Sequence, residues 1–595
     1  MSHFRIKFVL SLFALTTAVT PHLSVAAHIE LAPIIKEGTP GEVLLDDPIL
    51  PSLSGRTESS SGSGSVVKSV EDRTALPVNE TGNPGTFTQF RGLGLSAEDI
   101  DVEAFGVPLN SPQGGGFDFS SFPSYLFSDY QIQLGPSLAA FDPRGVAGTV
   151  SLKPWTATAL RSEKLSWHFT DLITSSNLFE ISAGTVNQAR TVSAVAGYRT
   201  GDSKGSGFGL SSVFYRSQEQ ATQLRFHLLA TDLDSLAPGS ASRPSPQQRQ
   251  VTARAIPVLQ LDQKISDALI LKSSLFYDLS YLRAEDPGVF ASKDHVGQLG
   301  NENTLLYKEW KFGASFRRVT YDQLDASVPE EDLLNLQITR SVESGRLLFE
   351  PTLQSVSVNR FGTYPGASLG ASYALERGTF AESARVFSRL SYSRKIPSFS
   401  ARYYVAPFFT PNPDLLPEVD LTAIAGFELK DRFWNGTFQA FFQSRQDAIL
   451  FNQTSNVNSG NARVASLVTS VGLQPLPILD LMNALTLSSS QVDATSREVP
   501  YLPTILNTLR MTFRPTDYLS AGLSSRWSSS VFPGGGADIP GYGLYDLFSE
   551  YHLDGEGQGL SLAAKVENLF DRPVELIKDF PLRGRVYSAF FSVAL

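Results

Sequence analysis

The sequence predicts an all-β membrane protein: a 22-stranded antiparallel transmembrane β-barrel with a small N-terminal α+β plug domain inside the lumen. Three observations predict it. The chain begins with an export-type leader, a glycine-rich segment follows, and from about residue 156 onward apolar and polar residues alternate. Alternation with a period of two gives each strand one apolar and one polar face, as the wall of a membrane barrel requires.

The first 27 residues have the order of a secretory signal peptide. Arg5 and Lys7 supply positive charge, residues 8–19 form an apolar core, and 25–27 offer small residues for cleavage. The alternative is an N-terminal membrane anchor. The apolar core is 12 residues long, whereas a spanning helix needs roughly 20. We therefore expect an exported mature chain without a transmembrane helix.

Composition narrows the function classes. The net charge of -10 argues against a nucleic-acid partner, because phosphate contacts need a clustered basic surface. The chain has no Cys, which excludes disulfides, thiolate metal sites and cysteine nucleophiles. It also suits a protein that crosses an oxidising periplasm.

The chain divides into segments that differ in composition and in periodic pattern. Residues 28–75 have little periodic pattern and are expected to be flexible or an atypical early plug, with a serine- and glycine-rich run at 56–65. Residues 76–155 are glycine-rich and are expected to form the plug core. Residues 156–595 are assigned to the barrel, and their 440 residues give 20 per strand for 22 strands. That length accommodates spanning segments of ~9–11 residues with turns and loops.

Alternation is clear in several hairpin segments, among them 269–281, 421–430 and 560–567. The stretch 431–436, ending in Asn435-Gly436, is expected to turn the chain between two strands. A soluble β-sandwich would give similar strands, and a propeller would need a repeat of about 40–50 residues, which is not found. The length of the pattern, its aromatic-rich apolar face and the leader favour the barrel.

Two segments resemble the ends of TonB-dependent outer-membrane receptors. The motifs Phe90-Arg91-Gly92-Leu93-Gly94, Ile100–Asn110 and Gln113–Asp118 resemble the plug core of that family, and 135–152 is similar to the glycine-rich run that follows it. Near the C-terminus, 566–573 and 581–587 resemble the closing hairpin of the barrel. A weaker match joins 394–399 with 412–418.

The chain also departs from the family pattern. The usual opening of the plug is not recognisable in 41–77, Leu134 replaces an arginine, Asp142 stands where glycine is common, and the last residue is Leu rather than Phe. The size is that of a compact, cobalamin-receptor-like member of the family.

The resemblance implies site residues of four kinds. A TonB box should be a short extended segment that pairs with a partner strand, and the candidate is Ile29, Glu30, Leu31, Ala32, Pro33, Ile34 and Ile35. Substrate-binding candidates at the plug apex are Asn83, Thr86, Phe87, Ser111, Gln113 and Phe117. Structural plug residues are Arg91, Gly92, Gly135, Pro136 and Gly148. The signal that closes the barrel is Tyr587, Phe591 and Leu595, and the alternative for each apex residue is that it merely shapes a turn.

No catalytic constellation is found, so we expect no enzyme. The Gly-x-Ser-x-Gly pattern at 201–205 lies in a polar turn rather than in the strand–turn–helix context of a nucleophile. An acidic run at Asp322, Asp325 and 330–332 could hold calcium through oxygen ligands, but the preferred interpretation is a solvated loop. No cofactor is otherwise expected, and a metal site remains unknown.

The function implied by the resemblance is import across the bacterial outer membrane. A scarce, bulky nutrient, such as a siderophore-like metal chelate or a cobalamin-like compound, would bind outside and enter by TonB-coupled rearrangement of the plug. Expected partners are outer-membrane lipid, TonB through the N-terminus, the barrel assembly machinery and a small-molecule substrate, around a monomer. The rival is a plugged barrel that acts as a surface receptor or structural protein without energy coupling, and an outer-membrane hydrolase is a weaker third reading.

Overall fold

The structure, a computed structural model, describes residues 49–594 apart from the internal segments 57–65, 72, 82–86, 123–125, 137–145, 155–163, 171–175, 187–189, 201–205, 217–220, 237–238, 246, 288–289, 324–325, 328–329, 377–380, 405–409, 452–453 and 554–559. The expected leader at 1–27 and the Gly-x-Ser-x-Gly pattern at 201–205 lie outside the described residues. No helix in the described part of the chain is long and apolar enough to cross a membrane.

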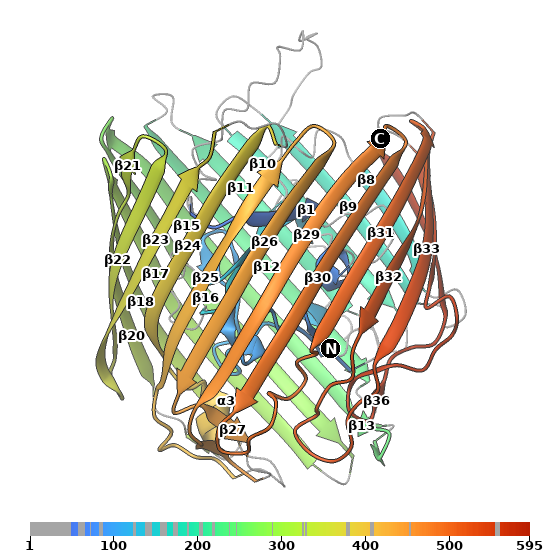
Figure 1. The fold of residues 1–595 in the computed structure, drawn as a ribbon. Coiled ribbons are helices and arrows are strands. Elements are labelled where there is room, and N and C mark those ends of the chain that lie inside the picture. Colours follow the sequence, from blue (N-terminus) through green and yellow to red (C-terminus); the bar gives the residue numbers. More distant parts are fainter. Residues whose placement is uncertain are drawn as a thin grey trace.

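A closed antiparallel barrel forms the outer wall (Figure 1). Its segments are β8 (Lys164–Thr170), β9 (Ser176–Val186), β10 (Arg190–Thr200), β11 (Ser206–Arg216), β12 (Thr222–Leu236), β15 (Arg249–Ser266), β16 (Leu269–Asp286), β17 (Phe290–Tyr307), β18 (Trp310–Gln323), β19 (Ala326–Ser327), β20 (Glu331–Arg340), β21 (Val342–Ser344), β22 (Leu347–Val358), β23 (Gly362–Ala374), β24 (Ser383–Lys395), β25 (Glu418–Lys430), β26 (Trp434–Gln446), β29 (Ala462–Leu476), β30 (Leu479–Val492), β31 (Ile505–Thr516), β32 (Leu519–Ser528), β33 (Tyr542–His552), β34 (Leu560–Glu567) and β37 (Val586–Ala594). The ring closes where β37 pairs with β8.

The all-β barrel is confirmed, whereas its strand number depends on what counts as a strand. The short segments β19 and β21 lie beside direct pairings of β18 with β20 and of β20 with β22. Leaving these two out of the ring gives 22 strands, and including them gives 24. The number 22 therefore stays a prediction that rests on this definition.

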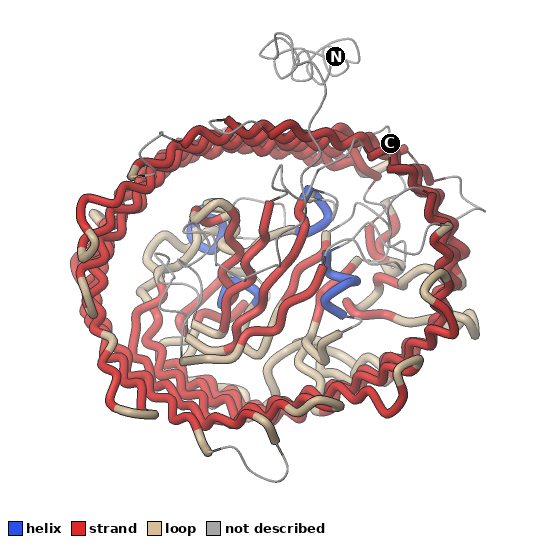
Figure 2. The backbone as a smooth tube through the Cα atoms, turned by 90° about the horizontal axis from the view of Figure 1, so that it is seen from above, coloured by secondary structure: helices blue, strands red, loops and turns tan. Residues whose placement is uncertain are grey.

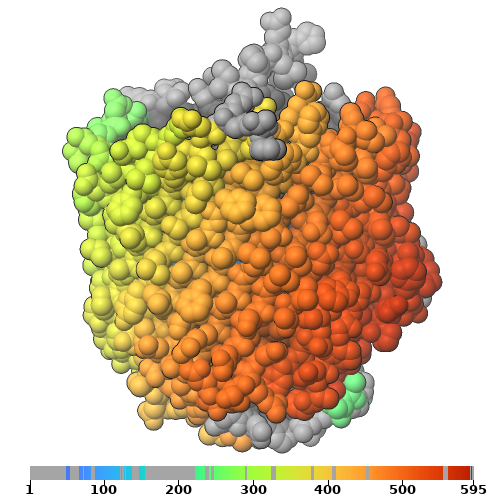
Figure 3. Space-filling model, viewed as in Figure 1, coloured from blue at the N-terminus to red at the C-terminus, as the bar shows by residue number. Residues whose placement is uncertain are grey.

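The wall alternates as the sequence pattern indicates. In β16, Leu275, Tyr277 and Leu279 are exposed on the outer face, whereas Phe276 and Asp278 are buried inside. In β16 the face toward the lipid is thus apolar, and the face toward the lumen carries the polar Asp278 beside Phe276. Figure 3 shows this side of the barrel as a continuous outer surface whose colours run from green to red along the sequence.

One expected turn is wrong by a few residues. The chain reverses at 431–433, and Asn435 and Gly436 lie inside β26, where they pair with Lys430 and Leu429. An Asn-Gly pair does not form a turn of its own where the chain has already changed direction a few residues earlier. Here Asp431 accepts the backbone N–H of Arg432 through its carboxylate and closes the turn earlier.

A five-stranded sheet lies inside the barrel (Figure 2). Its order is β1 (Ser52–Arg56), β6 (Phe127–Leu134), β7 (Gly148–Pro154), β4 (Ile100–Ala104) and β5 (Val107–Pro108). Only β4 and β7 pair in parallel. This sheet is the plug, and β1 comes from the stretch 28–75, so part of the early segment has regular structure.

Short elements complete the plug and the loops. They are α2 (Val66–Glu71), β2 (Val78–Glu80), β3 (Thr88–Phe90), η1 (Ala97–Asp99), η2 (Phe119–Ser121), β13 (Gly239–Ser240), β14 (Arg243–Pro244), α3 (Phe399–Tyr403), β27 (Ile449–Phe451), β28 (Asn456–Asn458), β35 (Glu575–Ile577) and β36 (Phe580–Pro581). The main apolar core lies between the plug sheet and the wall, because residues of both belong to one cluster of buried side chains.

The two rims of the barrel differ. One rim has short turns such as 267–268, 308–309 and 345–346, and the other has long connections such as 396–417 and 568–585. In Figure 1, α3, β27 and β36 lie at the lower, long-loop rim, while the C-terminus lies at the upper rim. In outer-membrane barrels the long loops face outward and the short turns face the periplasm.

Candidate functional site

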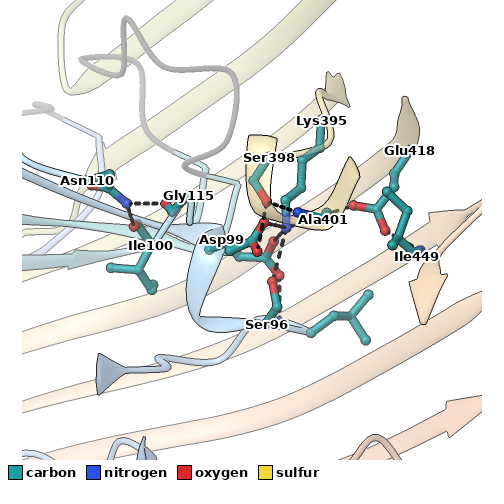
Figure 4. A network of polar contacts seen from close by, with 12 residues as sticks. Ser96, Asp99, Ile100, Asn110, Gly115, Lys395, Ser398, Ala401, Glu418 and Ile449 are labelled. Atoms are coloured by element: carbon teal, nitrogen blue, oxygen red, sulfur yellow. Dashed lines mark hydrogen bonds and ion pairs between the residues drawn. The ribbon is translucent and has the colours of Figure 1, made fainter. Parts of the chain in front are cut away.

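The loop between β5 and η2 forms the apex of the plug. Asn110 holds it, because its side-chain amide donates to the carbonyls of Ile100 and Gly115 at 2.8 and 2.9 Å, and its oxygen accepts from the backbone N–H of Val102 at 2.6 Å. Asn110 therefore ties the glycine-rich loop to β4 (Figure 4).

The apex loop reaches the barrel wall through Gln113. Its side-chain amide donates to the Tyr321 hydroxyl at 3.2 Å, and that hydroxyl donates to the Asp294 carboxylate at 3.1 Å. On its other side, the Gln113 carbonyl accepts the backbone N–H of Ser400 at 2.8 Å. Three separate parts of the chain, namely plug apex, barrel wall and long-loop helix α3, thus meet at one residue.

Helix α3 brings aromatic side chains over this point. Phe399 packs with Tyr321 and with Val296 and Val319 of the wall. The Arg402 guanidinium lies over the rings of Phe361, Phe399 and Tyr403 and is paired with Glu331 at 2.7 Å. We call the group Gln113, Asp294, Tyr321, Phe399 and Tyr403 the apex site.

A second group, buried between the plug and the wall, consists of charges. Asp99 of the plug lies 2.8 Å from the Lys395 ammonium and 2.8 Å from the Arg445 guanidinium of the wall. Arg445 also pairs with Asp420 at 3.0 Å, and Lys395 lies 3.8 Å from Glu418. We call Asp99, Lys395, Glu418, Asp420 and Arg445 the anchor cluster, part of which is drawn in Figure 4.

The anchor cluster is stabilised by mutual neutralisation. Burial by itself raises the pKa of the Asp99 carboxyl, but the charges of Arg445 and Lys395 outweigh it and hold that pKa well below its usual range. The carboxylate therefore stays ionised and keeps its two cationic partners across the plug–wall boundary.

Helix α2 supplies further ionic contacts with the wall. Lys68 lies 3.3 Å from Asp546, and Glu71 pairs with Arg526. Arg91, expected as a structural plug residue, is buried and donates to the carbonyls of Leu95 and of Pro500 in a long loop. Burial lowers the pKa of Arg91 to about 10, so it remains protonated at neutral pH.

The expected apex residues lie in different surroundings. Phe87 is exposed, and Ser111 shapes the loop by accepting the backbone N–H of Gly114. Gln113 makes the contacts described above. Phe117, which also belongs to the apex loop, is buried against Phe119 and Phe122, and its expected role in substrate binding stays a prediction. Asn83, Thr86 and the TonB-box candidate 29–35 lie outside the described residues.

The expected structural glycines lie at close approaches. Gly135 has φ +96°, and a Cβ there would lie 2.9 Å from Cγ2 of Ile424 in the wall. Gly92 has φ +63°, and a Cβ would meet Ile100. At Gly148 a Cβ would lie 2.7 Å from the carbonyl of Gln133. Pro136 is buried beside Gly135.

The closing strand is β37. Tyr587 and Phe591 are exposed on its outer face, and Phe591 lies opposite Leu562 of β34 and Trp167 of β8. Leu595 lies outside the described residues. β37 pairs with β34 on one side and with β8 on the other, so it lies at the seam where the two ends of the barrel meet.

Sequence reasoning missed the anchor cluster. Lys395 and Glu418 stand inside the two pieces of the weaker motif match at 394–399 and 412–418. An inward-facing Lys, Arg, Asp or Glu on a predicted barrel strand was the available signal, because an unpaired charge in the lumen is costly. Without the register of plug against wall, their partner Asp99 could not be assigned.

Two residues of the acidic run at 322–332 form ion pairs with arginines. Asp332 pairs with Arg318 at 2.7 Å and Glu331 with Arg402. The described residues contain no group of three or more His, Asp or Glu side chains placed to hold a metal ion. Asp325 lies outside the described residues, so loop calcium stays an untested expectation.

A closed barrel filled by an N-terminal plug, with ionic contacts between the two, defines a plugged outer-membrane receptor. The model of the TonB-dependent receptor-like β-barrel matches residues 99–569, and the chain belongs to that family. Its members are outer-membrane receptors and transporters of Gram-negative bacteria, and the outer membrane is therefore the location of this chain.

Solved structures share the fold at low sequence identity. The copper transporter OprC superposes with a TM-score of 0.75 at 14% identity, covering 91% of this chain and 100% of that one. The siderophore receptor PirA from Acinetobacter baumannii gives 0.76 at 12%, covering 92% and 99%. The FrpB iron transporter from Neisseria meningitidis, F5-1 variant, gives 0.75 at 11%, covering 91% and 99%. No curated protein sequence matches the chain.

Proposed function

We propose that the chain binds a scarce, bulky nutrient at the long-loop rim and imports it by TonB-coupled rearrangement of the plug. The observation that carries the proposal is the junction at Gln113, where plug apex, barrel wall and α3 are hydrogen-bonded together. A substrate that enters between the loops and the apex must compete with these contacts. Substrate binding would therefore change the contacts of the plug apex.

The substrate class favoured is a metal chelate or cobalamin-like compound. Similar folds belong to proteins named as iron, copper and siderophore transporters or receptors. The chain has no Cys and three Met, so thiolate ligands are lacking and thioether ligands are scarce for a bare soft metal ion. A metal would therefore arrive inside an organic ligand.

Import requires that the plug be displaced from the barrel wall, and the ion pairs of the anchor cluster must be broken for this to happen. Asp99 is held by two cations of the wall. A pulling partner on the N-terminus, through residues 29–35, would supply that work by pairing as an added strand. Binding alone would leave the anchor cluster intact.

The rival proposal is a surface receptor without energy coupling. The ionic contacts of α2 and of Asp99 with the wall favour it, because each one holds the plug in place. A barrel that never releases its plug could still bind a ligand outside.

Deletion of residues 29–35 separates the two proposals. Cells that depend on this protein are supplied with ferric hydroxamate, ferric catecholate and cobalamin, and uptake of each is measured with and without a protonophore. We expect uptake of one compound to vanish in the deletion and with the protonophore, while binding to cells persists. Binding of a compound to the cells with no uptake that either treatment abolishes supports the rival.

A further inference from the structure

Asp294 differs from the other buried acids of the inner wall. Among the described residues, Asp278, Glu302, Glu350 and Glu331 are each paired with an arginine, namely Arg254, Arg317, Arg389 and Arg402. Asp294 is equally buried, at 1% exposed, yet no ion pair joins it to a Lys or Arg in the described part of the chain. A buried carboxylate without a cation is energetically costly.

The groups that donate hydrogen bonds to Asp294 are neutral. Tyr321 donates its hydroxyl to Oδ1, and the Gln113 amide lies close to the same carboxylate. The second oxygen, Oδ2, has no hydrogen-bond partner in the described structure. His295 follows in the chain, but strand alternation turns it to the outer face, where it packs on Tyr281.

Aromatic side chains pack in a row that begins at Tyr321, the residue that donates to Asp294. Tyr321 and Phe399 lie with centroids 5.9 Å apart, and Tyr403 packs on Phe399 at 6.1 Å. Rings of this kind attract a cation that lacks its full hydration shell. The Arg402 guanidinium already lies over the rings of Phe399 and Tyr403 and is paired with Glu331. The part of the site that is chemically suited to an ammonium group is therefore the Asp294 carboxylate together with the adjacent ring of Tyr321.

We propose that Asp294 is a specificity-determining residue that binds an ammonium group of the substrate. This rests on the proposed function, since it assigns one recognition contact within the same apex site. The neutral amide of Gln113 and the hydroxyl of Tyr321 hold the carboxylate while the site is empty. An incoming ammonium group replaces the Gln113 amide, because a charge-assisted hydrogen bond is stronger than a neutral one.

Displacement of Gln113 also has a mechanical consequence. The same residue accepts the backbone N–H of Ser400 in α3. When its side chain leaves Tyr321, the apex loop loses a side-chain contact with the wall and keeps its backbone contact with α3. Recognition of the ammonium group would thus loosen the apex before the anchor cluster is disturbed.

The test uses the purified full chain in detergent and two small probes of equal shape. Binding of n-butylammonium and of butan-1-ol is measured by calorimetry at constant ionic strength. We expect saturable binding of the ammonium probe with a preference of at least about tenfold over the alcohol. Asp294→Asn should abolish the preference, and Asp332→Asn, which alters an exposed acid on the outer face, should leave it unchanged.

The variant Tyr321→Phe is included because Asp294→Asn could lose binding through misfolding alone. This variant keeps the carboxylate and removes one competing donor, so the ammonium preference should be retained or increased. No saturable binding to the wild type, an equal preference in Asp294→Asn, or loss of the preference in Tyr321→Phe overturns the inference. If import depends on residues 29–35 but the protein shows no preference for the ammonium probe, only this inference is refuted. If the protein prefers the ammonium probe but import does not depend on residues 29–35, only the proposed function is refuted.

Discussion

Asp99 and Lys395 lie 2.8 Å apart although 296 residues separate them in the chain. Both side chains are buried, one on η1 of the plug and the other at the end of β24 in the wall. Arg445 approaches the same carboxylate from β26. The two domains are therefore joined by a charge interaction in which the carboxylate of the plug depends on cations of the wall.

Asp99→Asn should weaken the attachment of the plug to the barrel wall. Lys395 and Arg445 retain Glu418 and Asp420 as partners, so the expected cost is roughly 1–3 kcal/mol, below that of an uncompensated buried charge. Conductance of single barrels in a planar bilayer is recorded while urea is raised. The variant should open at a lower urea concentration than the wild type, and Asp332→Asn, the matched control, should not. Equal opening concentrations would show that the cluster does not anchor the plug.

Glu103 of β4 gives the plug a pH dependence of opposite sign to that of Asp99. Burial raises the pKa of its carboxyl to about 8, with Glu302 adding to the effect and Lys311 opposing it. The protonated form is favoured in the folded plug, so its stability is full below the unfolded pKa and declines as pH rises through about 8. The lowered pKa of Asp99 keeps its contribution down to strongly acidic pH.

Hydrogen exchange of β4 amides between pH 5 and 9, corrected for intrinsic rates, checks this sign. Protection should fall toward pH 9 in the wild type and stay flatter in Glu103→Gln. A wild-type plug that becomes better protected as pH rises over that range contradicts the assignment.

Gly135→Ala should strain the plug where it meets the wall. The residue has φ +96°, and the added Cβ would lie 2.9 Å from Ile424 Cγ2. The backbone conformation costs about 1–2 kcal/mol for a non-glycine residue. Gly535→Ala is the control, because a Cβ there meets nothing within 4 Å. Thermal unfolding in detergent should show a lower first transition for Gly135→Ala only.

Removal of residues 586–595 should prevent assembly. Strand β37 pairs with β34 on one side and β8 on the other, so the ring cannot close without it. Surface levels measured with an antibody to an outer loop should fall to background, whereas Phe442→Ser, a single change on the outer face, should leave most protein inserted. Normal surface levels of the truncation contradict a role of β37 as the closing signal.

The sequence was sufficient for the barrel because strand alternation is a local property. Leu275 and Asp278 follow from a period of two without knowledge of the fold. The anchor cluster and the junction at Gln113 depend on the seating of the plug, which places Asp99 beside Lys395 and Gln113 beside Tyr321. No local pattern encodes that register, and for the same reason the burial of Phe117 against Phe119 and Phe122 could not be predicted.

The central claim, that energy coupling moves the plug against the wall, is tested most directly by labelling a buried thiol in living cells. The chain has no Cys, so Val150→Cys, at a plug position that is 1% exposed, introduces a single reporter. Cells receive spent medium of the source bacterium to supply substrate, and maleimide labelling is followed with and without a protonophore. Gly535→Cys serves as the exposed control. We predict faster labelling of position 150 in energised cells, with the difference abolished by deletion of 29–35, whereas equal rates under all conditions would contradict the account.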